Sequence, residues 1–307
     1  MTKRRTRAGL VGGALAGGLA AAGALVVARR VGAGRRAETI SIPLPRGRAV
    51  ITGASAGIGE EFARQLAAAG FDLTLVARRA ERLQALAAEL SAAHGIRAEA
   101  WPADLADEAD VAALARALAA ADDLMLLVNN AGFGTRGEFI EVELERTLDM
   151  IRVHVLATVT LCRAAAPGMV TRGGGAIINV SSIAAFFPSA GGANYGATKA
   201  YLNAFSEALA AELGGTGVVV QALCPGFTTT EFHDVGDYQE FDRGQIPAPL
   251  WMPARDVVGE SLAALASRRV IVVPGAKYRA IVAAANSPLG NPIRHAARAV
   301  RGRWRKG

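Results

Sequence analysis

Short apolar segments alternate with amphipathic ones between residues 48 and 273, and this alternation constrains the fold more than any other feature. We interpret the apolar segments as strands and the segments between them as helices. The predicted strands span residues 48–52, 72–77, 96–101, 124–129, 176–181, 218–223 and 270–273. The predicted helices span residues 58–69, 80–93, 108–121, 141–171, 194–213 and 254–267. Because strands that alternate with helices form right-handed βαβ units, we predict an α/β fold built on a doubly wound parallel sheet.

Tyr195 and Lys199 lie four residues apart near the start of the helix predicted for residues 194–213. Residues at this spacing share a helix face, so the phenol would lie beside the ammonium group. A nearby positive charge favours the phenolate and lowers the pKa of the phenol from about 10. The pair is therefore a candidate acid/base unit, although the same spacing also arises by chance on solvated helix faces.

A glycine-rich sequence, TGASAGIG at residues 52–59, follows the first predicted strand and opens the first predicted helix. Its glycines would let the backbone approach a pyrophosphate, and the helix N-terminus would offer free N–H groups to it. The spacing differs from the common Gly-x-Gly-x-x-Gly pattern, but the position between a strand and a helix indicates a dinucleotide site. The residues that we expect at this site are Gly53, Ser55, Gly57, Ile58 and Gly59.

The second and third predicted strands carry the features that distinguish one nicotinamide coenzyme from the other. The second strand is followed by Arg78 and Arg79 and by no acid, which favours NADP over NAD, unless the two arginines are simply solvated. Asp104, after the third strand, could accept a hydrogen bond from adenine or could cap a turn. After the fourth strand, Asn130, Ala131 and Gly132 form a loop at the carboxyl end of the sheet, where ligands bind.

Ser182 follows the fifth predicted strand, thirteen residues before Tyr195. Its hydroxyl could lie beside the phenol and hydrogen-bond a substrate oxygen on which charge develops. Aromatic residues gather in two nearby segments, which suggests an apolar substrate, although they could equally pack a lid or a subunit interface. These residues are Phe186, Phe187, Phe227, Phe232, Tyr238, Phe241 and Trp251.

Taken together and in this order, the motifs at 52–59, 129–132, Ser182, Tyr195/Lys199 and Pro225-Gly226 resemble the classical short-chain dehydrogenase/reductase family over residues 46–275. The resemblance implies a seven-stranded Rossmann-like sheet, one coenzyme per subunit and a homo-oligomer. It also implies that Tyr195 exchanges a proton with the substrate, that Lys199 lowers the pKa of Tyr195 and binds the nicotinamide ribose, and that Ser182 orients the carbonyl.

The resemblance extends to the segment after the sixth strand. It implies that Thr230 hydrogen-bonds the nicotinamide carboxamide, and we add Pro225, Gly226 and Thr228 to the predicted coenzyme contacts. Residues 227–252 match the family's mobile substrate lid.

One residue departs from the family pattern. Thirteen residues before Pro167, where the family has a fourth catalytic residue, an Asn, this chain has His154. An imidazole could keep the proton relay between Lys199 and solvent, or make that relay pH-dependent. It could equally be a buried structural histidine.

The net charge of +7 belongs to the two ends of the chain. Residues 1–36 and 294–307 contain basic residues and no acidic ones, whereas the stretch between them is net acidic. Basic residues outside a folded face argue against a nucleic-acid partner and fit an anionic membrane surface better. Ala8 to Ala28 carries no charge and, at about 1.5 Å per residue, could span a bilayer. A membrane anchor, a cleaved export signal and an interfacial arm all remain open.

We therefore divide the chain into an apolar N-terminal segment (1–36), a linker (37–45), a catalytic domain (46–275) and a basic C-terminal extension (276–307). The two cysteines have no metal-like or disulfide-like spacing and read as reduced thiols. We expect an NADP(H)-dependent oxidoreductase that acts on a lipophilic carbonyl or secondary alcohol. Its catalytic domain would be cytoplasmic, with a membrane anchor at residues 8–28. Two alternatives are a membrane-tethered, non-catalytic NADP-binding scaffold or redox sensor, and an isomerase or epimerase on the same fold.

Overall fold

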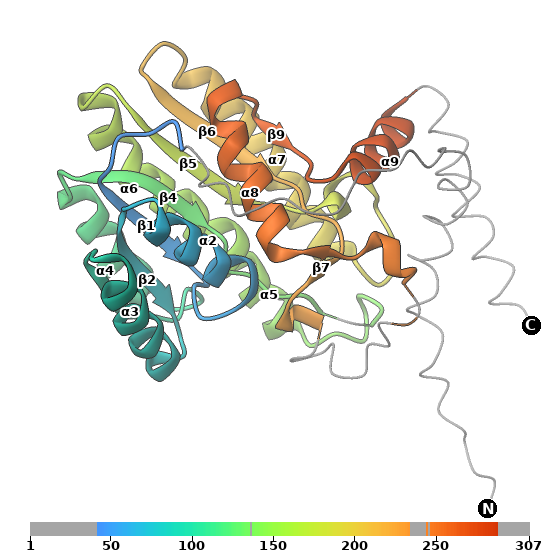
Figure 1. Ribbon diagram of the computed structural model, residues 1–307. Helices are drawn as coiled ribbons and strands as arrows, with labels where there is room; N and C mark the ends of the chain where they lie inside the picture. Colours follow the sequence, from blue (N-terminus) through green and yellow to red (C-terminus); the bar gives the residue numbers. More distant parts are fainter. Residues whose placement is uncertain (1–41, 136, 234–243, 245, 288–307) are drawn as a thin grey trace, which may run out of the picture.

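A seven-stranded parallel sheet forms the centre of the computed structural model, which describes residues 42–135, 137–233, 244 and 246–287 (Figure 1). The strand order is β3-β2-β1-β4-β5-β6-β9, as expected for a doubly wound sheet. Every neighbouring pair is parallel. The strands are β1 (Arg48–Thr52), β2 (Asp72–Ala77), β3 (Ala98–Pro102), β4 (Leu124–Asn129), β5 (Gly175–Val180), β6 (Val218–Leu223) and β9 (Ile271–Val272).

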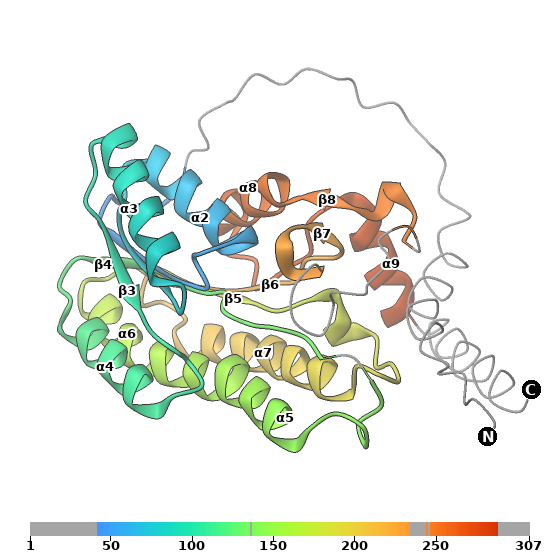
Figure 2. The same cartoon turned by 90° about the horizontal axis from the view of Figure 1, so that it is seen from below.

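Helices cover both faces of the sheet (Figure 2). One face carries α2 (Gly57–Ala68), α3 (Ala80–His94) and α8 (Ala254–Ala264), and the other carries α4 (Glu108–Ala120), α5 (Leu144–Ile151), α6 (Thr158–Thr171) and α7 (Ala193–Glu212). Two apolar clusters fill the space between sheet and helices, one on each face. β5 and β6, which are buried on both sides, are continuous apolar runs except for Asn179 and Gln221.

The long helical region predicted for residues 141–171 begins at Leu144 and runs without a gap to Thr171, with one π-helical turn inside it. A π-helical turn, η1 (Arg152–Ala157), joins α5 to α6. Among the described residues, Leu144–Thr171 is the one helix with the length and composition to cross a membrane. Its Leu161, Ala165 and Met169 are buried in the core cluster on the sheet, which accounts for its apolar character. The apolar segment 8–28 and the basic residues from 294 onward lie outside the described residues.

Several short elements lie at the carboxyl end of the sheet. They are the 3-10 helices η2 (Ile183–Phe186), η3 (Glu231–His233) and η6 (Ala248–Leu250), with the two-residue strands β7 (Thr228–Thr229) and β8 (Met252–Pro253). The 3-10 turn η7 (Leu265–Ser267) extends α8. One more helix, α9 (Ala276–Asn286), follows β9 and contacts η2. The sequence analysis did not predict α9, β7 or β8.

Candidate active site

The glycine-rich turn lies where the strand order reverses between β1 and β4, the position at which doubly wound sheets bind ligands. Gly53 and Gly57 have φ angles of 66° and 59°, which favour glycine. A Cβ on Gly59 would lie 2.3 Å from the carbonyl oxygen of Gly53, so the first turn of α2 rests directly on the backbone. The helix begins after Ala56, whose methyl group cannot cap it. Its first N–H groups are therefore available to a phosphate, and the turn fits a dinucleotide.

The loop after β4 is tied to this turn by hydrogen bonds. Asn130 Nδ2 donates to the carbonyl oxygens of Thr52 (2.9 Å) and Gly53 (3.3 Å). The hydroxyl of Thr52 accepts from the backbone N–H groups of Asn130 (2.9 Å) and Ala131 (3.0 Å). Two segments that were both predicted to contact the coenzyme therefore form one unit.

A basic corner lies beside the turn, at the start of α3. Arg79 Nε donates to Ser55 Oγ (3.0 Å) and Arg79 Nη2 to the carbonyl oxygen of Ser55 (3.1 Å). Arg79 Nη1 and Arg82 Nη1 both donate to Glu231 Oε2, at 3.1 and 2.9 Å. Arg79 and Ser55, which the sequence predicted for the coenzyme, are thus in contact, and Glu231 joins them from η3.

Arg78 and Asp104 form a looser pair at the ends of β2 and β3, with 3.9 Å between Arg78 Nη1 and Asp104 Oδ2. The Arg78 side chain is 70% exposed. Asp104 Oδ1 accepts from the backbone N–H of Ala106 at 3.0 Å, which is the turn-capping role that the sequence left open. The other carboxylate oxygen faces Arg78.

Lys199 and Tyr195 lie together on α7, as their spacing predicted. Lys199 is 4% exposed, and its Nζ is 5.7 Å from the centre of the Tyr195 ring. The ammonium group donates to the carbonyl oxygen of Val180 (2.9 Å), and the Lys199 carbonyl accepts from Ser181 Oγ (2.8 Å). Burial lowers the pKa of Lys199 to about 7, an effect that Cys224 opposes only in part.

Ser182 lies at the end of β5, beside the start of α7. Its hydroxyl accepts from the backbone N–H of Ala184 at 3.1 Å and caps η2. The N–H of Ile183 donates to the carbonyl oxygen of Pro225 at 3.0 Å, which ties η2 to the segment after β6. The fold therefore brings Ser182 and Tyr195 to the same edge of the sheet, on the neighbouring elements η2 and α7.

His154 lies in the π-helical turn Arg152–Ala157 and is 1% exposed. Its Nε2 accepts from the backbone N–H of Phe133 at 3.1 Å, so the proton of the neutral ring lies on Nδ1. Nδ1 is 2.9 Å from Thr198 Oγ1, which in turn donates to the carbonyl oxygen of Tyr195 at 2.9 Å. The imidazole and phenol rings meet edge to face, with centres 5.9 Å apart.

The surroundings of His154 keep it neutral. Burial and the charge of Lys199 hold its pKa well below the usual value. A Cβ on Gly132 would lie 2.7 Å from His154 Nε2, so the ring also fills the space under the loop after β4. Both ring nitrogens have partners other than Lys199, and the proton relay through His154 stays a prediction.

The segment after β6 lies over the glycine-rich turn. A Cβ on Gly57 would lie 3.1 Å from Thr230 Cβ, so these two predicted coenzyme contacts are adjacent. Thr228 Oγ1 donates to the carbonyl oxygen of Gly226 at 3.1 Å. Ile58, the second residue of α2, is partly buried against the core.

Tyr278 in α9 holds both ends of the predicted lid, and the sequence analysis did not identify it. Its hydroxyl accepts from the backbone N–H of Phe227 at 2.9 Å and donates to the carbonyl oxygen of Leu250. A Cβ on Gly226 would lie 2.0 Å from the Tyr278 ring, so only glycine fits there. Burial raises the pKa of Tyr278 to about 12, which keeps the hydroxyl protonated.

The aromatic residues expected around the substrate divide into two groups. Phe186, Phe187 and Phe227 pack with Tyr278 in a small apolar cluster, and Trp251 contacts the Phe227 ring. Phe232 instead faces Tyr195, with ring centres 6.4 Å apart. Tyr238 and Phe241 lie outside the described residues.

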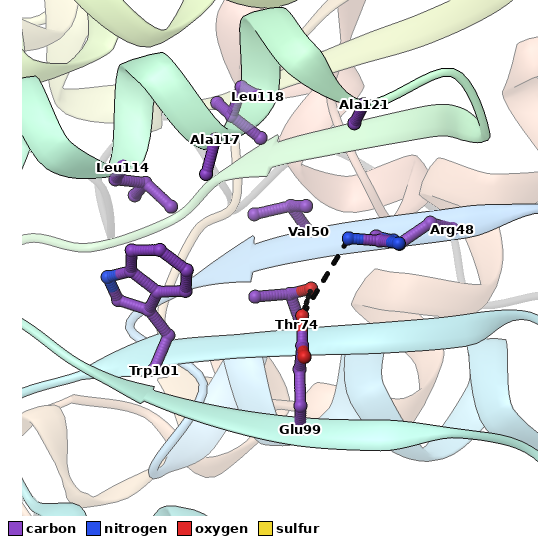
Figure 3. Close-up of a pocket in the computed structure, with 9 residues that line it drawn as sticks. All are labelled: Arg48, Val50, Thr74, Glu99, Trp101, Leu114, Ala117, Leu118 and Ala121. Carbon is purple, nitrogen blue, oxygen red and sulfur yellow. Dashed lines mark hydrogen bonds and ion pairs between the residues drawn. The ribbon is translucent and has the colours of Figure 1, made fainter.

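A separate small pocket lies between the sheet and α4, away from the residues above (Figure 3). Glu99 in its wall accepts from Thr74 Oγ1 at 2.7 Å and pairs with Arg48 at 3.8 Å. Its volume of about 20 Å³ suits a single water molecule rather than a substrate. Among the described residues, no cluster of His, Cys, Asp and Glu could hold a metal ion. The residues that line the small pocket are Arg48, Val50, Thr74, Glu99, Trp101, Leu114, Ala117, Leu118 and Ala121.

The sheet, the glycine-rich turn at its switch point and the Tyr195/Lys199 pair define an oxidoreductase that uses a nicotinamide dinucleotide. Comparison with known proteins agrees. The profile of the family described as "short chain dehydrogenase" matches residues 48–238, and the chain belongs to this family.

Three relatives illustrate the range of the family. A very-long-chain 3-oxoacyl-CoA reductase of Anas platyrhynchos is 33% identical over 191 residues, which cover 61% of this chain and 61% of the relative. A short-chain dehydrogenase of Sphingobium yanoikuyae, solved with NADPH, is 36% identical with a TM-score of 0.69, over 78% of this chain and 93% of the other. A family member of Burkholderia phymatum, solved with NAD, is 27% identical with a TM-score of 0.67, over 78% and 92% of the two chains.

Proposed function

We propose that this oxidoreductase uses NADP(H) to reduce a carbonyl group, or to oxidise a secondary alcohol, on a lipophilic small molecule. The observation that carries the proposal is the buried Lys199 ammonium group 5.7 Å from the Tyr195 ring, at the edge of the sheet that also holds the glycine-rich turn. A positive charge at this distance favours the phenolate, and the low exposure strengthens the effect.

In this proposal, Tyr195 is the acid/base group and Ser182 holds the substrate oxygen. During reduction, Ser182 Oγ would donate a hydrogen bond to the carbonyl oxygen, and the Tyr195 hydroxyl would give that oxygen its proton. Lys199 would stabilise the phenolate that remains. A bound nicotinamide dinucleotide would supply the hydride, or accept it in the reverse reaction. His154 would position the start of α7 through Thr198, in addition to any relay function.

The proposed preference for NADP rests on the basic corner. Arg78 and Arg79 follow β2, and Ser55 lies in contact with Arg79. An acidic residue at the end of β2 would favour the ribose hydroxyl of NAD, and Ala77 occupies that end here. The Arg79 guanidinium group beside the Ser55 hydroxyl, with Arg78 next to it in the chain, is suited to a phosphate monoester.

The proposed lipophilic substrate rests on Phe232 beside Tyr195 and on the relative named for very-long-chain 3-oxoacyl-CoA. This chain spans about 61% of that relative's length, so its substrate does not transfer directly. A location at a membrane, with residues 8–28 as anchor and the catalytic domain in the cytoplasm, would suit such a substrate. A homo-oligomer is part of the same proposal.

The test follows NADPH and, separately, NADH absorbance with medium-chain aldehydes, ketones, quinones, steroids and a long-chain 3-oxoacyl thioester. We expect Tyr195→Phe to lower the rate by about 100- to 10,000-fold, the usual contribution of an acid/base group. NADPH binding, measured by calorimetry, should stay within about 3-fold, because the phenol acts in proton transfer. Tyr201→Phe is the matched control, since Tyr201 is exposed on the same helix and stacks on Phe205.

Two outcomes would contradict the proposal. A Tyr195→Phe variant that keeps the wild-type rate would remove Tyr195 from the chemistry. A preference for NADH over NADPH would remove the proposed role of Arg78 and Arg79.

A further inference from the structure

The basic corner proposed for the coenzyme already holds an anion of the protein itself. Both carboxylate oxygens of Glu231 accept from Arg82 Nη1, each at 2.9 Å, and Oε2 also accepts from Arg79 Nη1 at 3.1 Å. Glu231 lies about 150 residues further along the chain than the two arginines, in the short helix η3. The fold, and not local sequence, brings this carboxylate to the corner.

The donors of Arg79 are largely occupied in this arrangement. Its Nε and Nη2 donate to Ser55, and its Nη1 donates to Glu231. Three of the five N–H donors of this guanidinium group are therefore taken, and a phosphate that approaches Arg79 meets the negative charge of Glu231 on the same group. Ser55 belongs to the glycine-rich turn and is 9% exposed, whereas the Glu231 side chain is 45% exposed. Glu231 is the partner that can leave.

We propose that Glu231 is a specificity-determining residue, which holds Arg79 and Arg82 in the coenzyme-free protein and which the 2′-phosphate of NADP(H) displaces from them. This inference rests on the NADP(H) preference proposed above. A phosphate monoester carries a charge of about −1.5 to −2 near pH 7 and therefore outcompetes a single carboxylate. NAD(H) has no phosphate at this position and has nothing to exchange with Glu231.

The ionisation of Glu231 agrees with this role. Partial burial by itself would raise the pKa of the carboxyl group, but the hydrogen bonds and charges of Arg79 and Arg82 outweigh it and hold the pKa below the usual value. Glu231 is therefore an anion throughout the neutral range. The competition is between two anions for the same pair of guanidinium groups.

The proposal predicts that Glu231 affects the affinity for nucleotides with a 2′-phosphate and not the affinity for nucleotides without one. Glu231 weakens the binding of a ligand that has the 2′-phosphate and leaves a ligand without it unaffected. Glu231 also adjoins Thr230, which lies over Gly57, so the displaced carboxylate belongs to the segment that covers the glycine-rich turn. Binding of the phosphate would thus release a contact between that segment and α3.

The experiment measures the affinity of the full chain for adenosine 2′,5′-bisphosphate and for 5′-AMP by calorimetry, so it needs neither turnover nor substrate. We expect Glu231→Gln to tighten binding of the bisphosphate by about 3- to 10-fold, because two exposed ion pairs with the competitor are lost. Binding of 5′-AMP should change by less than about 2-fold. The gain should shrink as salt is added, since exposed ion pairs are screened.

Glu89→Gln is the matched control. Glu89 pairs with Arg64 elsewhere on the surface, and its side chain is 54% exposed, so it tests for a general effect of removing one negative charge. It should leave both affinities unchanged.

The two proposals fail in different ways. A wild-type protein that binds both nucleotides equally well contradicts the NADP(H) preference, and the inference with it. A wild-type protein that prefers the bisphosphate, combined with a Glu231→Gln variant that binds it equally or more weakly, contradicts the inference alone. Weaker binding would mean that Glu231 stays on Arg79 and Arg82 and holds them in place for the bound phosphate.

Discussion

The glycine-rich turn and the base of the predicted lid follow two strands of the same sheet, yet they are held in place differently. The turn depends on the backbone, because there is no room for a Cβ on Gly59 against the carbonyl oxygen of Gly53, six residues earlier in the same motif. The base of the lid depends on one distant side chain, Tyr278, which hydrogen-bonds Phe227 and Leu250. The contact between Gly53 and Gly59 is thus a local constraint, whereas the contacts of Tyr278 are long-range ones.

The strongest test of the backbone constraint is Gly59→Ala. The added Cβ would lie 2.3 Å from a carbonyl oxygen, and we expect a loss of about 3 kcal/mol in the free energy of unfolding. The clash would exceed the gain of about 1 kcal/mol that alanine brings to a helix. Urea denaturation measures the change. Gly174→Ala is the control, because nothing lies within 4 Å of a Cβ there. Equal stability of the two variants would break the comparison.

Tyr278→Phe tests the long-range constraint and should have the next largest effect. The variant keeps the ring against Gly226 but leaves the N–H of Phe227 and the carbonyl of Leu250 without their partner. We expect a loss of about 2 kcal/mol in the free energy of unfolding, because two hydrogen bonds to partly buried backbone groups are lost. Tyr201→Phe, on the exposed face of α7, should cost less than about 0.5 kcal/mol. If the two variants were equally stable, α9 would not hold the ends of the predicted lid.

The pH dependence of stability tests whether burial lowers the pKa of Lys199. The pKa of Lys199 is about 7 in the folded protein, against an ordinary value of 10.5. Between pH 7 and 8.5 the unfolded chain therefore binds more protons, and the free energy of unfolding should rise with pH by about 1–2 kcal/mol. Lys199→Met should remove this rise. The measurement is urea denaturation of the coenzyme-free protein.

The upper limit of pH 8.5 is chosen because of the cysteines. Burial raises the pKa of both Cys162 and Cys224 to about 12, which lowers stability once the pH passes the ordinary thiol range. A wild-type protein whose stability is constant from pH 7 to 8.5 would show that Lys199 keeps its ordinary pKa.

The sequence predicted the elements whose cause is local. The alternation of apolar and amphipathic segments predicted the parallel sheet, and the spacing of Tyr195 and Lys199 predicted their shared helix face, both of which the structure has. The order of motifs predicted the family, which the comparisons confirm.

The features that the sequence did not predict all depend on distant partners. Tyr278 contacts a residue 51 positions away, and Glu231 contacts Arg79 across 152 positions. The π-helical turn at His154 is visible only once the ring is placed against Phe133 and Thr198. The periodicity of the sequence does not encode such contacts, because each of them forms only when the helices and loops have packed around the sheet.

The position of Tyr278 also sets an order of events during protein synthesis. A ribosome makes Gly53 and Gly59 early, and the strands that flank them can pair while the rest of the chain is still being translated. The hydrogen bond from Phe227 to Tyr278 has to wait until α9 has been made and has left the ribosome. A nascent chain could therefore form its glycine-rich turn before Tyr278 can bind Phe227 and Leu250.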